Sequence, residues 1–312
     1  ILEAICVLLR LQSPCTSTVT DLFKSKTNGF ALEGVFNDTR LSFRNTDEGR
    51  QISLDSKVQL KSADYLEVAR VTWFANTDLE LVKGGGALRR RYLDFLGVQS
   101  APGYKRALSN YERTQRSRNA LLKVGRHRRE IAAFDSSLIE SGELLMEARA
   151  ALCSSLGPLA RKSCEEISGQ ADVLEIRYRP SCNGPFAEAL AASRDEEDRL
   201  RQTVCGPHRD DIEVALNGLK ASAFASEGQQ RSIALALKIA QARHIESLHG
   251  HPPLLLLDDI FGELDTERRN RLLTALPSDA QAVITTTFLD WVADTASDAV
   301  FFLADGRLKS GK

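Results

Sequence analysis

Several features that would assign the chain to a particular class of protein are missing from its sequence. Its six cysteines form no C-x-x-C pair, so neither a zinc site nor a disulfide framework is indicated, and we expect the thiols to be reduced. No apolar run approaches the roughly eighteen residues of a membrane span, and the first residues have neither the charged start nor the cleavage site of a signal peptide. These absences favour a soluble protein of the cytoplasm.

A second absence concerns phosphate binding. No G-x-x-x-x-G-K-[ST] loop occurs anywhere in the sequence. The triplet Gly84–Gly86 has Lys83 before it but no Lys-Ser or Lys-Thr after it, so we interpret it as a hinge rather than a phosphate cradle. The chain also starts with Ile1 instead of Met, in the middle of the apparent helix ILEAICVLLRL, which suggests a cut end.

The composition is that of a globular protein with an uneven charge distribution. The 312 residues are 43% hydrophobic and 27% charged, enough for one large domain or two ordinary ones. The net charge is −1, but residues 83–129 contain 13 Lys plus Arg and two acids, a local charge of +11. The rest of the chain therefore carries about −12, so a cationic island lies in an acidic protein.

The pattern of apolar residues predicts an α/β fold with a helical insertion. Residues 29–75 are typical of an antiparallel meander followed by one more strand. Long charged helices are expected between about 87 and 169. After residue 211, strands that are apolar on both faces alternate with helices, which indicates a largely parallel sheet. We therefore divide the chain into an N-terminal part of the core (1–82), a mainly helical lobe with a basic face (83–200) and a C-terminal part of the core (201–312).

Two adjacent carboxylates follow a buried strand in the segment LLLLDDIFGELD. The carboxyl end of a parallel strand opens on the ligand crevice, where an Asp can orient metal-bound water. Asp258 is therefore a candidate for holding Mg²⁺ through water, and Asp259 is a candidate catalytic residue that accepts a proton from the attacking water. The alternative is that an apolar strand ends in two solvated acids.

Two further segments flank this strand. Ser226-Glu227-Gly228-Gln229-Gln230 opens a strongly helical run 28 residues before it, and Gly262-Glu263-Leu264-Asp265 follows the two carboxylates. A small polar residue and a Gly leave free backbone N–H groups at the positive end of a helix dipole, which suits a phosphate. An ordinary helix cap with Ser226 as N-cap is the alternative.

In this order, the three segments resemble the signature motif, the Walker B strand and the D-loop of the ABC-type ATPases, which include the SMC and Rad50 heads. The resemblance implies a P-loop NTPase-like head with an inserted helical lobe, in which ATP joins two subunits. It assigns Ser226, Gly228 and Gln229 to the γ-phosphate bound by the other subunit, and Glu263 and Asp265 to the D-loop. TVCGPHRDDIEVALNG, GQQR and the basic helices narrow the resemblance to the RecF family over nearly the whole chain.

The RecF resemblance also has implications for the remainder of the ATP site. ILEAI is similar to the residues after Gly-Lys-Thr in the family's phosphate loop, so a Walker A loop is expected immediately before Ile1, and the printed chain is expected to be inactive as an ATPase. Asp259 stands where most ABC ATPases have Glu, which is one methylene longer, and this implies slow hydrolysis. Thr286 or Thr287 falls near the position of the superfamily's switch His.

The segment GPHRDD is distinctive of the same family. His208 and Arg209 are candidates for a nucleotide or dimer contact. The alternative is a turn in which Arg209 pairs with Asp210 or Asp211.

The cationic island contains few acids, whereas a solvated helix face usually mixes both signs. Such a field neutralises phosphates by releasing counterions, which gives sequence-independent, salt-sensitive binding. We therefore expect DNA binding there, with structural ion pairing to the acidic core as the alternative for the RRR segment. The candidate DNA-binding residues are Arg89, Arg90, Arg91, Lys105, Arg106, Arg113, Arg116, Arg118, Arg126, Arg128 and Arg129.

By resemblance to the RecF family, the chain is expected to be an ATP- and Mg²⁺-dependent DNA-binding protein of recombinational repair. The resemblance implies that it dimerises on ATP as a clamp at gapped or single-strand/double-strand junction DNA, and that it helps to load RecA with RecO and RecR. Two alternatives stay open, namely a DNA-binding scaffold without a phosphate loop and another SMC- or Rad50-like ATPase head.

Overall fold

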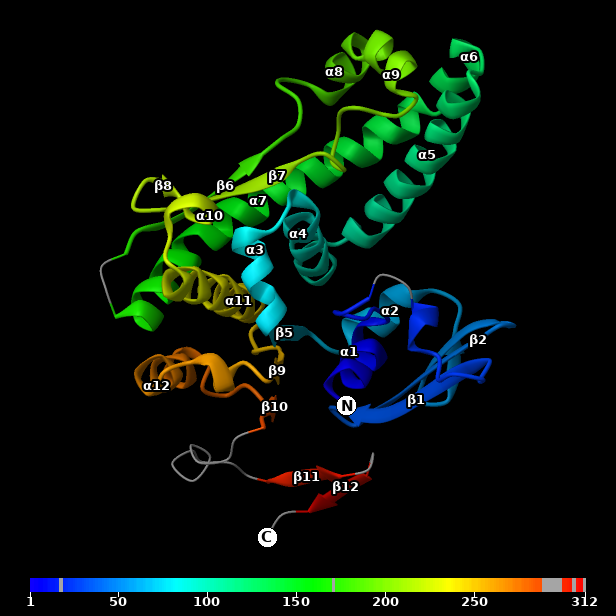
Figure 1. The fold of residues 1–312 in the computed structure, drawn as a ribbon. Helices are drawn as coiled ribbons and strands as arrows, with labels where there is room; N and C mark the ends of the chain where they lie inside the picture. The colour runs from blue at the N-terminus through cyan, green and yellow to red at the C-terminus, as the bar shows by residue number, and fades with distance from the viewer. Residues whose placement is uncertain (17–18, 170–171, 288–298, 305–306, 311–312) are drawn as a thin grey trace.

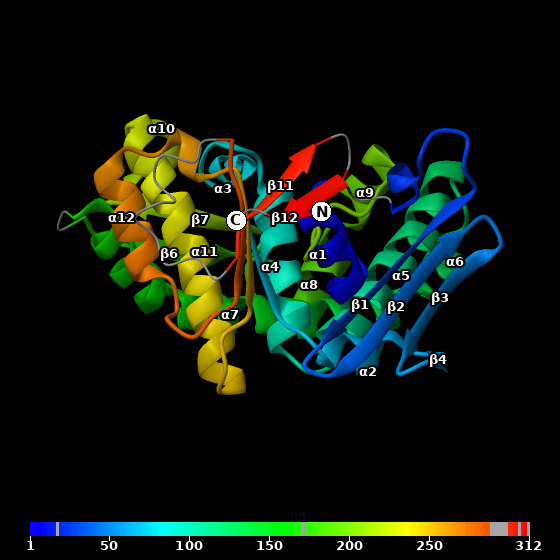
Figure 2. The same ribbon diagram turned by 90° about the horizontal axis from the view of Figure 1, so that it is seen from below.

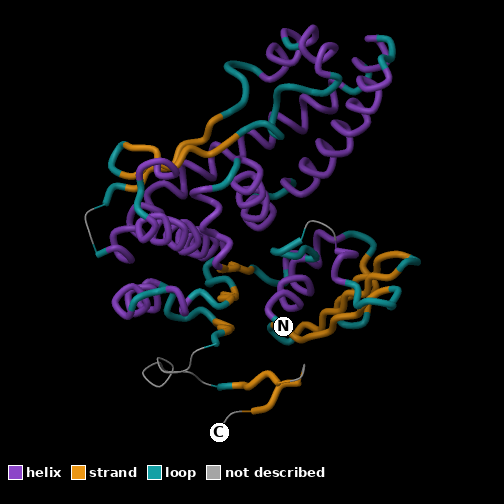
Figure 3. Tube along the Cα trace, viewed as in Figure 1, coloured by secondary structure: helices purple, strands orange, loops and turns teal. Residues whose placement is uncertain are grey.

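The computed structural model describes residues 1–16, 19–169, 172–287, 299–304 and 307–310 (Figure 1). A small parallel sheet lies at the centre, and a long helical arm extends away from it (Figures 1 and 3). Within the described ranges, no helix is both long enough and apolar enough to cross a membrane.

The N-terminal part is an antiparallel sheet covered by helices. Its strands follow the order β1-β2-β3-β4, which confirms the predicted meander. Because alternate residues of these strands point inward, Leu41, Phe43 and Ile52 are buried against the first helix. The elements are α1 (Leu2–Arg10), the 3-10 turn η1 (Val19–Leu22), β1 (Gly29–Phe36), β2 (Thr39–Thr46), β3 (Gly49–Leu54), β4 (Lys57–Gln59) and α2 (Ser62–Glu67).

The parallel sheet predicted for the core is confirmed, and within the described residues it has three strands in the order β10-β9-β5. These strands are β5 (Val71–Ala75), β9 (Leu254–Asp258) and β10 (Ala282–Thr285). Along β9, Leu254 and Leu256 face the cluster under α1, whereas Leu255 and Leu257 face the cluster on the other side. Both faces are therefore buried, which explains the uninterrupted run of leucines. Figure 2 shows α11 and α12 to one side of the sheet and α1 with β1–β4 to the other.

Two segments do not join the parallel sheet, contrary to prediction. The strand β7 (Asp211–Leu216) pairs antiparallel with β6 (Leu174–Arg179) and β8 (Leu219–Lys220), and β11 (Phe301–Ala304) pairs antiparallel with β12 (Arg307–Ser310). In β7 every second residue is only half-buried. This alternation is typical of a strand with one open face rather than of a strand covered on both sides.

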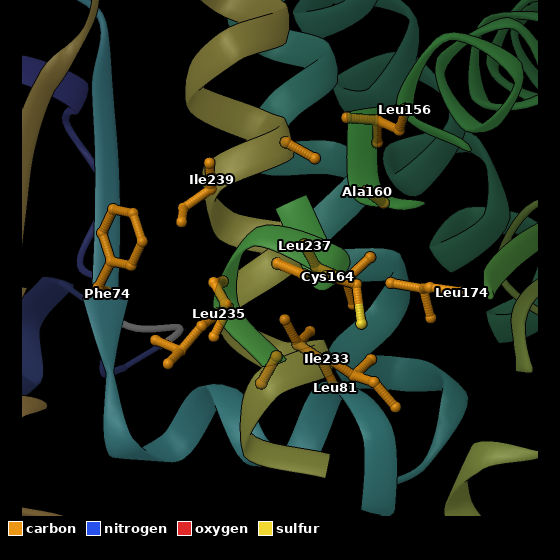
Figure 4. Packing of buried hydrophobic residues seen from close by; sticks show 14 of the residues in the cluster. Phe74, Leu81, Leu156, Ala160, Cys164, Leu174, Ile233, Leu235, Leu237 and Ile239 are labelled. Carbon is orange, nitrogen blue, oxygen red and sulfur yellow. The ribbon is translucent and has the colours of Figure 1, made fainter. Parts of the chain in front are cut away.

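The largest cluster of buried side chains lies between the sheet and two long helices, α7 (Asp135–Ser168) and α11 (Glu227–His249). Figure 4 shows Phe74 of β5 pointing toward Ile239 and Leu235 of α11, with Leu156, Ala160 and Cys164 of α7 on the far side of that helix. The nearly all-round burial of α11 fixes its N-terminus, and hence the Ser226 segment, relative to the sheet.

The helical lobe packs around α7, and a separate buried cluster that includes Tyr104, Tyr111, Leu138 and Phe186 stabilises its outer half. Its predicted long helices are present, and Gly84 and Gly85 form a helix-to-helix connection. The helices of the lobe are α3 (Glu80–Lys83), which follows the 3-10 turn η2 (Asn76–Leu79), α4 (Gly86–Ser100), α5 (Tyr104–Val124), α6 (Arg128–Ala132), α8 (Phe186–Ala192) and α9 (Arg194–Leu200). The remaining elements are α10 (Ala221–Phe224), the 3-10 turn η3 (Phe261–Glu263) and α12 (Thr266–Ala275).

Candidate nucleotide site and nucleic-acid interface

The two candidate carboxylates lie at the carboxyl edge of the parallel sheet. Asp258 is the last residue of β9, and the strand register places it between Ala75 of β5 and Thr285 of β10. Because all three strands run in the same direction, their polar ends meet at this edge. Asp259 follows immediately, where the chain leaves the sheet.

Hydrogen bonds fix the two carboxylates differently. The Thr285 hydroxyl donates to Asp258 Oδ1 at 2.9 Å and accepts from the backbone N–H of Asp259 at 3.1 Å. Asn76 Nδ2 donates to the backbone carbonyl of Asp259 at 3.2 Å. Asp259 has φ +50°, and its Oδ1 is buried without a hydrogen-bond partner among the residues that the structure describes. A left-handed backbone and an unsatisfied carboxylate oxygen are costly, and such features cluster at functional sites.

The candidate signature residues form the N-terminus of α11. Ser226 caps the helix reciprocally, because its hydroxyl accepts from Gln229 N at 3.3 Å and its own N–H donates to Gln229 Oε1 at 2.9 Å. Both residues therefore have a structural role as a capping box, and Ser226 is also exposed to solvent. The interpretation of this segment as a cap is thus confirmed, and its assignment to a phosphate stays a prediction.

The D-loop candidates lie next to this helix within the same subunit. Glu263 forms an ion pair with Arg231 of α11. Asp265 caps α12 by accepting from Arg268 N at 2.8 Å, and it also pairs with the Arg268 guanidinium at 2.9 Å. The backbone hydrogen bond lowers the pKa of Asp265, and the guanidinium adds to this effect. The same guanidinium lies against Gly228, where a Cβ would be 3.0 Å from Arg268 Nη2 and the Arg268 tip would have to shift slightly.

The switch candidates lie at the end of β10. Thr286 is half-buried and Thr287 is exposed, and both follow the last residue of the strand. Thr285, one position earlier, donates a hydrogen bond to Asp258. Sequence reasoning missed Thr285, although the in-phase pairing of LLLLD with AVIT would have aligned it with Asp258.

A buried ion pair that sequence reasoning also missed connects α11 with the end of β5. Lys238 Nζ lies 3.4 Å from Asp78 Oδ1, and Asp78 Oδ2 accepts from the backbone N–H of Ala75 at 2.8 Å. Burial raises the pKa of Asp78, and the Lys238 ammonium opposes that rise. The sequence does contain a signal for this pair. Lys238 is the single charge in the apolar run SIALALKIA, and a buried charge needs a partner of opposite sign.

The segment GPHRDD joins the helical lobe to β7. His208 Nδ1 is 2.7 Å from the Tyr111 hydroxyl, and its Nε2 is 3.0 Å from the carbonyl of Thr203. Because a carbonyl only accepts, Nε2 carries the proton and Nδ1 accepts from Tyr111. Burial lowers the pKa of His208 to about 4, so the ring is neutral. Arg209 is exposed, and its contact with a nucleotide or a second subunit stays a prediction, as does that of His208.

The acids of GPHRDD have partners other than Arg209. Asp211 accepts two hydrogen bonds from the Arg89 guanidinium, at 2.7 and 2.8 Å. Asp210 is buried, where it accepts from the Tyr178 hydroxyl and from Ser181 N and lies 3.8 Å from Arg149. The pairing of Arg209 with either acid, which was the alternative interpretation, is therefore wrong within the described part of the chain.

The exposed basic residues of α5 form one stripe, which we call the α5 stripe. At about 100° per residue its members point within about 100° of one another. They are Lys105, Arg106, Arg113, Arg116 and Lys123. The buried residues of the helix, such as Tyr111 and Leu122, lie on the opposite face. From end to end the stripe is about 27 Å long at about 1.5 Å per residue, which matches about eight phosphates of one DNA strand at about 3.4 Å each.

One predicted DNA contact is wrong, because Arg118 is buried with 1% of its surface exposed. Its guanidinium donates to both carboxylate oxygens of Glu197 at 2.6 and 2.8 Å and to Asp135 at 2.9 Å. It therefore cannot reach a phosphate in this fold.

Four other members of the predicted set are partly occupied by protein contacts. Arg89 pairs with Asp211, Arg90 donates to the carbonyl of Asp210 at 2.7 Å, Arg91 donates to the carbonyls of Ser13 and Thr16, and Arg128 lies 3.5 Å from Glu197 and 3.6 Å from Asp198. Arg126 and Arg129 are exposed beyond the end of α5.

The described geometry can be compared with known proteins. No family model matches the sequence. The DNA replication and repair protein RecF of Microcystis aeruginosa is 36% identical in an alignment 314 positions long, which covers 93% of this chain and 84% of that protein. The chain belongs to the RecF family. Its fold agrees with this assignment, since a structure of the recombination mediator protein RecF-ATP in the RecFOR pathway superimposes with a TM-score of 0.88 at 27% identity, over 100% of this chain and 87% of that one.

A more distant likeness shows the wider fold class. An SMC head bound to the C-terminal winged-helix domain of ScpA has a TM-score of 0.50 at 13% identity, over 99% of this chain and 84% of that one. The predicted architecture, an ABC/SMC-type ATPase head with an inserted helical lobe, is therefore confirmed. The sequence left open a RecF-like head and another SMC- or Rad50-like head, and membership of the RecF family decides for the first.

Proposed function

We propose that this member of the RecF family is an ATP-controlled DNA-binding protein of recombinational repair. The observation that carries the proposal is the pairing of Asp258 and Asp259 with Thr285 at the carboxyl edge of the parallel sheet, in a chain whose relatives are DNA replication and repair proteins. A structure of a relative in the family is described as RecF-ATP. These findings support ATP as the ligand of this edge.

The donor groups at the edge fit a magnesium nucleotide. Mg²⁺ prefers oxygen ligands such as carboxylates, hydroxyls and water. Asp258, Asp259 and Thr285 supply such groups side by side, and the buried Oδ1 of Asp259 lacks a hydrogen-bond partner within the described residues. ATP and Mg²⁺ would supply the phosphoanhydride and the neutralising charge, with Asp258 holding the metal through water.

The chain's own groups have separate roles at this edge. Thr285 fixes the orientation of the Asp258 carboxylate through its 2.9 Å hydrogen bond. Asp259 is the proton acceptor for water, and its left-handed backbone holds the short side chain in place. Because Asp is one methylene shorter than Glu, we expect slow turnover, as suits a switch.

Two subunits would complete the site. We infer that Ser226, Gly228 and Gln229 of one subunit approach the γ-phosphate held by the other, where the free N–H groups of α11 favour an anion. Glu263 and Asp265 would lie at the same contact between subunits. Within one subunit they are already close to the signature residues, because Glu263 pairs with Arg231 of α11 and the Arg268 partner of Asp265 lies against Gly228. The resulting ATP-dependent homodimer would close as a clamp on gapped or junction DNA and act with RecO and RecR in loading RecA.

The α5 stripe is the surface that we assign to the DNA backbone. It is exposed, lies along a single helix face and carries five cations against one exposed acid, Glu112. Its binding would be independent of sequence and would weaken as salt increases.

The clamp is tested by light scattering of the natural full-length polypeptide with and without ATP and Mg²⁺. We expect a dimer only with ATP. Ser226→Arg should remain monomeric while still binding ATP, because the blocked contact is made to the other subunit's phosphate. Asp259→Asn should give a dimer that persists, since the proton acceptor is lost. Ser154→Arg, the same change at an exposed serine of α7, is the matched control and should dimerise normally. A monomer under all conditions would refute the clamp.

A further inference from the structure

A buried ion pair joins α11 to η2, the turn that follows β5. Lys238 Nζ of α11 lies 3.4 Å from Asp78 Oδ1, and the two side chains are 7% and 16% exposed. Within the described part of the chain, Asp78 is the one acid at ion-pair distance from this ammonium. The ammonium also lies 5.6 Å from the centre of the Tyr92 ring, which belongs to the largest buried cluster.

Stability alone does not account for a pair of this kind. Taking two opposite charges out of water costs about as much as their attraction returns, and well-packed apolar side chains in the same places are often equally stable. Such a pair does provide direction, because a carboxylate held by a hydrogen bond and a counterion has one orientation. Asp78 is held in this way, since its Oδ2 accepts from the backbone N–H of Ala75 at 2.8 Å. The pair therefore fixes the shape of η2 and its place against α11.

The turn that the pair fixes lies beside Asp259. Asn76, the first residue of η2, donates from Nδ2 to the backbone carbonyl of Asp259 at 3.2 Å. Ala75, at the end of β5, is the register partner of Asp258. Asp259 itself has φ +50°, a conformation that a non-glycine residue keeps only when its surroundings impose it. Thus η2 supplies one of the contacts that hold Asp259 in place.

The signature segment lies at the other end of this set of contacts. Ser226 caps α11, and Lys238 lies about three turns, or about 18 Å, further along the same helix. The helix is buried nearly all round, and Phe74 of β5 points toward its Ile239 (Figure 4). Because closely packed interiors transmit displacements, a shift of the helix at Ser226 reaches Lys238. Continuous contacts therefore run from the signature segment through the ion pair to Asp259.

We propose that Lys238 and Asp78 are positioning residues, which place Asp259 according to the position of the signature helix. They act through Asn76 rather than on the substrate. This inference rests on the proposed function and adds a means of regulation at the same site. A subunit whose α11 contacts the phosphate held by its partner keeps its own Asp259 in the productive position. Hydrolysis in one subunit therefore depends on the contact that this subunit makes with the other nucleotide.

The main variant, which we call the neutral pair, combines Asp78→Asn with Lys238→Met in the full-length polypeptide. It leaves no uncompensated buried charge, and the new amide oxygen can still accept from Ala75 N. We expect it to bind ATP with unchanged affinity but to hydrolyse ATP about tenfold more slowly. Its ATP-induced dimer should dissociate about tenfold more slowly in light scattering. Lys238→Arg keeps the charge near Asp78 and should retain most of the wild-type rate.

The matched control is Arg243→Met, which breaks another ion pair of the same helix. Arg243 Nη2 lies 2.6 Å from Glu166 and ties α11 to α7 instead of η2. It should lower stability without changing turnover or dimer lifetime. Hydrogen exchange without nucleotide gives a readout that is independent of ATP. Residues 76–79 and 259–261 should exchange about tenfold faster in the neutral pair and at wild-type rates in Arg243→Met.

The last step of the connection is tested by Asn76→Ala. Asn76 is exposed, so this change does not disturb the core. It should slow hydrolysis about tenfold by itself. Added to the neutral pair, it should cause little further loss, because both changes break the same set of contacts.

The outcomes separate the positioning role from the general function. Three results would each overturn the role and leave the ATP-dependent function standing. They are wild-type turnover in the neutral pair, an equal loss in Arg243→Met, and a loss of about a hundredfold when Asn76→Ala is added to the neutral pair. A wild-type chain that neither binds ATP nor dimerises with it would overturn the proposed function itself.

Discussion

The carboxyl edge of the parallel sheet and the basic helical lobe use their charged residues in different ways. At the sheet edge, position in the sequence determines position in space, because a parallel strand must end where its neighbours end. On α5, adjacent charges point in different directions. Arg116 and Arg118 are two residues apart, yet Arg116 is exposed and Arg118 is among the most buried side chains of the molecule. A charge at a strand end is thus easier to interpret than a charge on a helix.

The largest expected effect comes from removing the buried member of this pair of arginines. Arg118→Met leaves the Glu197 carboxylate, which is 0% exposed, without its main counterion. We expect a loss of about 3–5 kcal/mol in the free energy of unfolding, measured by urea denaturation. Arg116→Met should change stability by less than about 0.5 kcal/mol and should weaken DNA binding.

A double substitution sharpens this prediction. Replacing both Arg118 and Glu197 by Met removes the uncompensated charge, so most of the lost stability should return. If Arg118→Met alone is as stable as the wild type and loses DNA affinity, the distinction between structural and DNA-facing arginines is wrong.

The next effect concerns His208, which couples the lobe to β7. Its pKa is about 4 in the folded chain, against about 6.5 when unfolded. The unfolded state therefore binds more protons between these values, and stability is complete above pH 6.5 and decreases as the pH falls. The expected loss is about 3 kcal/mol by pH 4.

The measurement is the difference in unfolding free energy between wild type and His208→Gln across this pH range, so that other titrating groups cancel. Glutamine retains an amide N–H for the carbonyl of Thr203 but does not titrate. The variant should lose less stability than wild type between pH 6.5 and 4. Parallel curves would mean that His208 does not govern the acid sensitivity of the junction.

Local patterns predicted much of this fold. The meander, the long helices between about 87 and 169 and the LLLLDD strand were all predicted, because each has a clear period. The size of the parallel sheet was not predicted. The strand at Asp211–Leu216 pairs with β6, and no local pattern determines which distant strand a segment joins.

The candidate site was predictable to a similar extent. Asp258 and Asp259 were identified because an apolar strand before two acids is an unusual arrangement. The role of Thr285 depends on the register between two distant strands, which neither strand reveals by itself. Long-range packing is therefore the part that one sequence does not reveal, and it also decides which arginines are buried.

The smallest expected effect tests the sheet edge. Thr285→Val keeps the shape of the side chain but removes the hydroxyl that donates to Asp258 and accepts from Asp259 N. We expect a loss of about 1 kcal/mol in unfolding free energy, measured by thermal melting, and impaired ATP-dependent dimerisation of the full-length polypeptide. Thr285→Ser restores the hydroxyl and should recover both properties, whereas Thr287→Val, at an exposed position two residues later, should preserve stability. If Thr287→Val disrupts dimerisation and Thr285→Val does not, the switch lies at Thr287. Position at a strand end would then be no easier to interpret than position on α5.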